Sequence, residues 1–211
     1  MTGGRTVFAE LKKLIGLVSE LHMHICEEWK SYCDESKILE FNQSKNTVCD
    51  VFCDERIYTS IFQYQAFLVS LFRQLDVDFG VRMRIKAKNS IEDKLSRYMQ
   101  GEEKGKIPIR KCLNDIFGIR AILHVNVQFE EIRDLVANNF KNVRVIDSTK
   151  HEQNYCATHL YFHHDNNSFD WELQIWYSGC AKSNEASHKA YKQRYTSWEN
   201  ENKENKENKE E

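Results

Sequence analysis

The spacing of hydrophobic residues changes partway along this 211-residue chain, and that change constrains the fold most. Residues 6–31 and 57–75 carry apolar side chains three and four positions apart, which predicts two amphipathic helices. Later stretches predict a helix at 130–138 and strands at 117–125, 143–147, 157–163 and 169–176. We expect the last two strands to pair in antiparallel fashion around a turn at 165–167. Expected helices and strands that alternate along the chain in this way favour an α/β fold with a mixed β-sheet flanked by helices.

The remaining segments divide the chain into three parts. Residues 36–54 are polar and look irregular, whereas the hydroxyl-x-x-acid form of Ser90-Ile91-Glu92-Asp93 predicts a helix start at Ser90. The closing Asn-Lys-Glu repeats have too few apolar residues to bury a core. We therefore expect an N-terminal helical extension at 1–79, a core domain at 80–197 and a charged disordered tail at 198–211.

Composition excludes several classes of protein. The seven cysteines include no CxxC pair, which favours reduced thiols in a cytoplasmic protein. No apolar run is long enough to span a membrane, and no signal-peptide pattern opens the chain, so we expect no membrane partner. The chain has a net charge of −2, but residues 82–97 hold six Lys and Arg against two acidic residues. That one basic segment is suited to binding an anion.

The residue types in the basic segment are those that a polyphosphate requires. Arg84 and Lys86 precede the expected helix, while Ser90 and Lys94 lie four positions apart within it. The first turn of a helix presents free N–H groups and the positive end of the helix dipole, so it binds phosphate readily. The alternative is that Ser90 is only a helix cap and the lysines are only a solvated surface.

Two carboxylates are candidate metal ligands. Asp115 precedes the first predicted strand of the 117–176 region, where it could hold Mg²⁺ or cap a turn. Glu172 and Gln174 share one face of the last strand, which suggests either a site or an exposed sheet face. If strands 117–123 and 169–176 are neighbours, Asp115 and Glu172 could meet over one metal ion.

Tyr155 and His159 lie four positions apart at a junction between a loop and a strand. A tyrosine there can stack on a purine base, and a histidine can reach phosphate or ribose. The alternative is that both side chains are simply packed in the interior.

Five motifs, in this order and spacing, resemble the synthetase domain of RelA/SpoT proteins. They are Arg84-x-Lys86-x3-Ser90-x3-Lys94, Asp115-x-x-Gly118-x-Arg120, Tyr155-x3-His159, Glu172-x-Gln174 and His188-x-x-Tyr191-Lys192. The similarity covers roughly residues 80–195, and the chain resembles a single-domain small alarmone synthetase. The resemblance implies a nucleotidyltransferase-like synthetase fold at 80–197 and an enzyme that moves pyrophosphate from ATP to a ribose 3′-hydroxyl.

The resemblance also implies a role for each motif residue. The ATP-binding residues would be Arg84, Lys86, Ser90, Lys94 and Arg120. Among these, Arg84 and Arg120 would sandwich the adenine, and the others would hold the phosphates. The catalytic pair would be Asp115 and Glu172, which would bind Mg²⁺ as cofactor, with Glu172 also placed to activate the 3′-hydroxyl. The acceptor-binding residues would be Lys150, Tyr155, His159 and Gln174, with Tyr155 stacked on the acceptor base.

The departures from the family pattern concern the acceptor. The family's Asn-Gly-Tyr-Arg-Ser-x-His corresponds to residues 153–159, which lack that glycine and arginine, and Trp176 and Tyr177 replace the Arg-Thr that follows Glu-x-Gln-x. Few residues other than the charged tail follow Tyr195, so we also expect the chain to lack the C-terminal helices that assemble housekeeping small synthetases into tetramers. The acceptor-side departures and this expected absence are both similar to the toxic branch of the family, some members of which pyrophosphorylate the 3′ end of tRNA. The implied acceptor is GDP or GTP, giving (p)ppGpp. The alternatives are a tRNA-modifying toxin with an antitoxin partner and a catalytically silent nucleotide-binding regulator.

Overall fold

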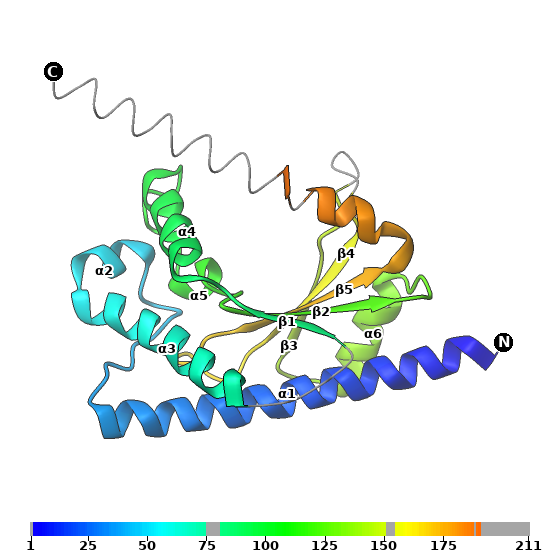
Figure 1. The fold of residues 1–211 in the computed structure, drawn as a ribbon, viewed down its shortest axis with the longest axis horizontal. Helices are drawn as coiled ribbons and strands as arrows, with labels where there is room; N and C mark the ends of the chain where they lie inside the picture. The colour runs from blue at the N-terminus through cyan, green and yellow to red at the C-terminus, as the bar shows by residue number, and fades with distance from the viewer. Residues whose placement is uncertain (1, 75–80, 151–154, 188, 191–211) are drawn as a thin grey trace, which may run out of the picture.

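A mixed sheet forms the centre of the molecule (Figure 1). The computed structural model describes residues 2–74, 81–150, 155–187, 189 and 190. Five strands lie in the order β1-β2-β5-β4-β3; their bounds are Arg82–Ile85 for β1, Phe117–Leu123 for β2, Val143–Asp147 for β3, Ala157–Phe162 for β4 and Trp171–Tyr177 for β5. Strands β2 and β5 are parallel, and the other neighbouring pairs are antiparallel. The expected α/β fold with a mixed sheet is confirmed.

Helices lie on both sides of this sheet. The α-helices are α1 (Thr2–Ser36), α2 (Val48–Cys53), α3 (Glu55–Gln74), α4 (Lys88–Gln100), α5 (Ile109–Cys112) and α6 (Phe129–Asn139), with a 3₁₀ turn η2 at Ser178–Cys180. In Figure 1, α1 and α3 run below the sheet, while α4 and the helical segment 181–187 stand above it. Within the described ranges, no helix is both long and apolar enough to cross a membrane.

The lower face of the sheet carries the hydrophobic core. Ile119, Leu160 and Leu173 lie on this face because they follow the alternation of β2, β4 and β5, and each is at most 3 % exposed. They form one buried cluster with Ile15 of α1 and Ile61 of α3. The helices α1 and α3, which lie within the 1–79 extension that the sequence suggested, therefore share a single core with the sheet. The proposed domain boundary at residue 79 and the tail at 198–211 lie outside the described residues.

Two local expectations were wrong. Within the segment 36–54, expected to be irregular, Val48–Cys53 forms α2, because Thr47 and Asp50 make a reciprocal capping box and Val48 and Val51 are buried. Helix α4 begins at Lys88 with Ala87 as its N-cap, so Ser90 lies inside the helix and is not the cap. The burial of Ile91 and Leu95 fixes this helix against the core from its first turn.

His22 of α1 is a buried titratable group that should make stability depend on pH. Its ring nitrogen Nε2 lies 2.9 Å from the carbonyl oxygen of Phe169, and burial lowers the pKa of the imidazole from 6.5 to about 4. Between those two pH values the unfolded chain binds a proton that the folded chain does not. Stability should therefore fall as the pH is lowered through this window, by at most about 3 kcal/mol from His22.

The change in unfolding free energy between about pH 7 and about pH 4.5 tests this expectation by urea titration. His22→Gln keeps a donor for the Phe169 carbonyl but cannot titrate, so its dependence on pH should be shallower than that of the wild type. His24→Gln, at an exposed position of the same helix, is the matched control and should behave as the wild type does. Equal slopes in wild type and His22→Gln would contradict the assignment.

Candidate active site

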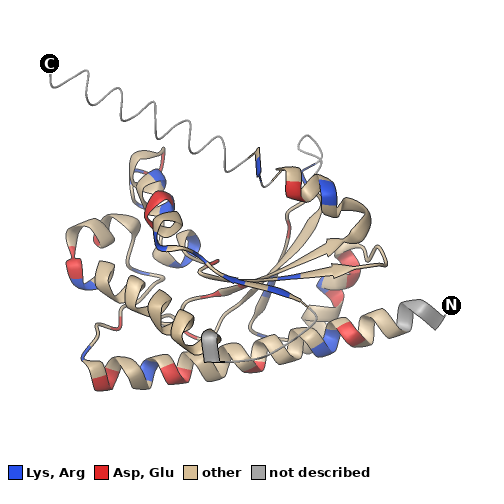
Figure 2. Cartoon of the chain, in the orientation of Figure 1, with Lys and Arg blue, Asp and Glu red and all other residues tan. Residues whose placement is uncertain are grey.

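The upper face of the sheet is polar from one edge to the other. The register of the strands places Arg84, Gly118, Glu172, Tyr161 and Arg144 in one continuous row across all five strands. A second row, displaced by two residues, contains Arg82, Arg120, Gln174, His159 and Ile146. Figure 2 shows Lys and Arg positions along β1, the strand at one edge of this sheet. A sheet face that bears so many ionisable groups is a candidate site.

Asp115 is the centre of a cluster of cations at one end of these rows. Its carboxylate accepts hydrogen bonds from the ammonium groups of Lys86 and Lys94, at 2.5 and 2.9 Å, and Arg84 lies 3.9 Å away. Three segments of the chain supply these four residues. Arg84 and Lys86 lie at the end of β1, Lys94 lies in the helix α4, and Asp115 lies in the turn before β2. Three cations around one carboxylate leave an excess of positive charge, which suits a triphosphate.

The cluster also fixes the charge state of Asp115. Burial by itself would raise the pKa of this carboxyl, but Lys94 and Lys86 hold it well below its usual range. Burial lowers the pKa of Lys86 despite the nearby carboxylate, whereas Asp115 outweighs burial at Lys94 and raises the pKa of that ammonium group. Asp115 is therefore an ionised carboxylate that Lys86 and Lys94 hold in place.

Glu172 is the second buried carboxylate, and it lies in a hydrogen-bond network of its own. Its Oε1 accepts a hydrogen bond from the hydroxyl of Tyr161 at 3.0 Å and lies 2.9 Å from Nδ1 of His159, while Oε2 accepts from the amide of Gln174 at 2.8 Å. Burial is the largest single influence and opposes ionisation here too, but the contacts with His159 and the hydrogen bond from Gln174 together outweigh it and lower the pKa of Glu172. Glu172 is thus available as a base or a metal ligand.

A pocket of about 300 Å³ opens beside Glu172 and Arg84 on this face. It is lined by Arg82, Met83, Arg84, Gly118, Ile119, Arg120, Glu172 and Gln174. Gly118 lies opposite Arg84, and a Cβ at this position would meet the Nε of Arg84 at 3.4 Å, so the glycine lets the arginine lie close against the sheet. The strands predicted to be neighbours are neighbours, and the predicted ATP-binding pair Arg84 and Arg120 lines one pocket with Glu172.

The two buried carboxylates supply oxygen ligands of the kind that a magnesium ion binds. Within the described part of the chain, no cluster of three or more His, Cys, Asp or Glu could form a metal cage made of protein ligands alone. Mg²⁺ usually takes one or two carboxylates and completes its shell with phosphate oxygens and water. Asp115, two residues before β2, and Glu172, on the adjacent strand β5, are both ionised and match that requirement.

Other predicted residues lie further from this pocket or are packed. Tyr155 is 8 % exposed, and its hydroxyl lies 3.0 Å from Nε2 of His159, so stacking of a base on its ring stays a prediction. Lys150 pairs with Tyr155 through the backbone, and its side chain is exposed. Ser90 lies one turn before Lys94 on α4. The motif residues His188, Tyr191 and Lys192 lie outside the described residues.

Sequence reasoning missed two residues of the site. Tyr161 donates to Glu172, and Trp176 lies under the guanidinium of Arg120. The signal was present, because Tyr161 follows His159 by two positions and Trp176 follows Gln174 by two, so alternation places them on the same faces as those residues.

Comparison with known proteins finds similarity at the level of solved structures. No protein-family model matches the chain, and no curated protein matches it. It is similar to small alarmone synthetase 2 from Bacillus subtilis, with 17 % identity, a TM-score of 0.37 and coverage of 66 % of this chain and 76 % of that one. It is also similar to small alarmone synthetase 1 from Bacillus subtilis bound to its product pppGpp, with 16 % identity, a TM-score of 0.32 and coverage of 71 % and 94 %. The solved structures that this chain is similar to thus include members of the family that its motifs resemble.

Proposed function

We propose that this chain is an ATP-dependent pyrophosphokinase that transfers pyrophosphate to the 3′-hydroxyl of GDP or GTP. The observation that carries the proposal is the placement of two ionised, buried carboxylates beside a cluster of cations on the polar face of the sheet. Transfer of a phosphoryl or pyrophosphoryl group depends mainly on positioning and on neutralising phosphate charge. The order and spacing of the motifs in the sequence support the same reaction.

Each part of the site has a task in this reaction. Lys86, Ser90 and Lys94 bind the phosphates of ATP through hydrogen bonds, and Arg84 and Arg120 stack on its adenine. Asp115 and Glu172 would hold Mg²⁺, which would further neutralise the charge of the phosphates. Glu172 accepts the proton of the attacking 3′-hydroxyl, and His159 and Tyr161 hold its carboxylate in place. In this reaction, GDP or GTP gains the β- and γ-phosphates of ATP, and AMP is released.

The assay that tests this proposal uses the full chain, γ-labelled ATP and Mg²⁺, with GDP, GTP or deacylated tRNA as acceptor. Label on GDP or GTP, together with release of AMP, is the expected result. ATP binding without label on any acceptor would instead indicate a catalytically silent nucleotide-binding regulator. Omission of Mg²⁺, with a chelator present, should abolish the transfer.

A tRNA acceptor is the second candidate, and exposed cations at both edges of the polar face favour it. Arg82 on the edge strand β1 is exposed, and Arg144 on the opposite edge strand lies over the ring of Tyr161. A polyanion that contacts such residues loses affinity steeply as salt is added, whereas a mononucleotide shows a shallower dependence. Label on tRNA that is lost when Arg82 and Arg144 are changed to Glu would make the chain a tRNA-modifying toxin. An antitoxin partner belongs to that alternative.

Arg84→Ala and Arg120→Ala should each weaken the binding of ATP. Each guanidinium lines the pocket, and the loss of one cation–π contact with the adenine should cost about 0.5–2 kcal/mol. Calorimetric titration with a non-hydrolysable ATP analogue measures this cost. Arg133→Ala, at an exposed position on α6, is the control and should bind as the wild type does. Unchanged affinity in both pocket variants would place the adenine elsewhere.

A further inference from the structure

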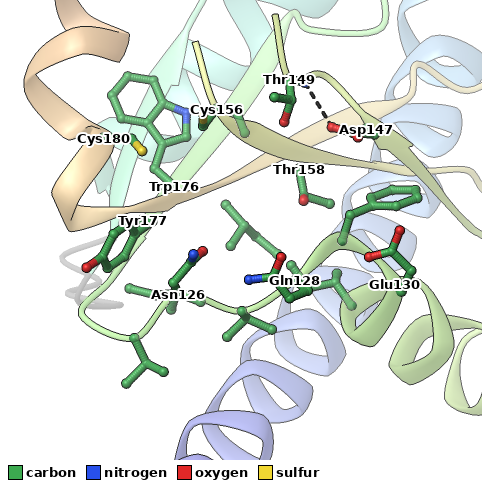
Figure 3. A pocket seen from close by; sticks show the side chains of 17 residues that line it. Asn126, Gln128, Glu130, Asp147, Thr149, Cys156, Thr158, Trp176, Tyr177 and Cys180 are labelled. Carbon is green, nitrogen blue, oxygen red and sulfur yellow. Dashed lines mark hydrogen bonds between the residues drawn. The ribbon is translucent and has the colours of Figure 1, made fainter. Parts of the chain in front are cut away.

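A second cavity, of about 360 Å³, lies on the lower face of the sheet, opposite the proposed active site (Figure 3). Strands β2, β3 and β5 run in the same direction, and their last residues, Leu123, Asp147 and Tyr177, all line it. The start of α6 contributes Phe129 and Glu130. Ligands of α/β proteins commonly bind at the carboxyl ends of strands, and small-molecule sites have volumes of about 300–1,000 Å³. Position and size therefore make this cavity a candidate binding site.

The hydrophobic core ends at this cavity with a hydroxyl that has no partner. Along the lower face of β4, the core residue Leu160 is followed by Thr158, whose neighbour on β3 is Asp147. Thr158 is only 7 % exposed, and its side chain points into the cavity (Figure 3). Its hydroxyl forms no hydrogen bond with any residue that the structure describes. Because buried polar groups are normally hydrogen-bonded, this hydroxyl marks a place for a polar group of a ligand.

The lining of the cavity is negatively charged. Glu130 and Asp147 are its acidic residues, and none of the described residues that line it is Lys, Arg or His. The N-terminus of α6 does not reverse this balance, because it already has an anion of its own: the carboxylate of Glu131 accepts a hydrogen bond from the amide of Gln128 at 3.0 Å. The cavity therefore favours a cation over an anion.

The cation that fits this cavity is organic. Among the described residues, no group of three His, Cys, Asp or Glu could hold a metal ion, and the volume is far larger than a single ion fills. An ammonium group donates three hydrogen bonds and is charged at neutral pH. The carboxylates of Glu130 and Asp147 and the hydroxyl of Thr158 can all accept such bonds. Apolar side chains suited to a short carbon chain also line the cavity: Val127, Ile132 and Ile175.

We propose that this cavity binds a small aliphatic amine, whose ammonium groups pair with Glu130 and Asp147 and donate a hydrogen bond to Thr158. The inference goes beyond the proposed pyrophosphokinase function and does not depend on it, because none of these three residues belongs to the proposed active site. Thr158 directly precedes His159 in β4, so the amine contacts the strand that carries an acceptor-side residue on its other face.

The test is calorimetric titration of the full chain with putrescine, at low salt and without ATP or Mg²⁺. The wild type should bind putrescine, whereas butanediol, which has hydroxyls in place of both ammonium groups, should not bind. Asp147→Asn and Glu130→Gln should each weaken binding about 2- to 5-fold, and the double variant about 4- to 25-fold. Thr158→Val, which removes the hydroxyl, should weaken it about 2- to 10-fold.

Asp134→Asn is the matched control, because Asp134 is exposed on α6, does not line the cavity and changes the net charge by the same amount as either single variant. It should bind putrescine as the wild type does. Both cavity carboxylates are exposed, so the double variant should fold and carries the test even if Thr158→Val does not. The inference is wrong if the wild type does not bind putrescine, or if the double variant binds it as tightly as the wild type. Equal affinity for butanediol, or an equal loss in Asp134→Asn, would likewise contradict it.

Discussion

Asp115→Asn should lower the rate of pyrophosphate transfer at least about a thousandfold, because the loss of one ligand charge at a metal site removes several kcal/mol of transition-state stabilisation. The structure adds a second consequence. Asp115 is the counterion of Lys86 and Lys94, whose side chains are only 14 % and 15 % exposed. Without that carboxylate, two buried ammonium groups face each other, so the variant should also be less stable by about 3 kcal/mol. Labelled-ATP kinetics and urea unfolding measure the two effects.

A second substitution separates the two consequences of Asp115→Asn. The double variant Asp115→Asn, Lys94→Met removes one of the unpaired charges, so it should regain part of the lost stability. It should regain no activity, because the metal ligand is still absent. Wild-type turnover by Asp115→Asn would remove this residue from the metal site. A single variant as stable as the wild type would show that the lysines do not depend on the carboxylate.

The order of strands and helices could be predicted because burial leaves a local signature. The alternation in 169–176 and the helical spacing in 6–31 each reflect one buried face, and the structure has β5 at Trp171–Tyr177 and α1 at Thr2–Ser36. The ends of α1 and the presence of α2 were missed. Helix α2 depends on a capping box and on contacts with residues distant in the sequence, such as the hydrogen bond from the Val48 amide to the carbonyl of Ile107.

The candidate site could be predicted only as a set of residue types. Spacing placed Glu172 and Gln174 on one face, and the register confirms it. Spacing could not predict that Asp115 neutralises Lys86 and Lys94, because three separate segments meet there. Nor could it predict the link between His159 and Glu172, which depends on how β4 pairs with β5. The spacing of residues in the sequence predicts which face of a strand a side chain lies on. The residues that it contacts depend on how distant strands and helices pack together.

Glu172→Gln should lower kcat by a factor of about 10² to 10⁴, the range that positioned general bases contribute. Glutamine has nearly the same shape and can still accept the hydrogen bond from Tyr161, so the fold should be retained. ATP binding should change little, because the cations around Asp115 remain in place. Single-turnover measurements with the ATP site saturated separate the chemical step from binding. A wild-type rate would assign the base to another group.

The pH dependence of kcat tests the role of Glu172 more strictly, because His159 lowers the pKa of the Glu172 carboxyl. Glu172 must be ionised to accept a proton, so the rate should fall as the pH drops through its pKa, which the hydrogen bond from His159 lowers against the opposing effect of burial. His159→Ala removes that bond and leaves burial dominant, so the pKa of Glu172 should rise and the acid limb should move to higher pH. His163→Ala is the matched control, since its imidazole is paired with Asp170 and not with Glu172. An acid limb at the same pH in wild type and both variants would mean that Glu172 is not the group whose ionisation the reaction requires.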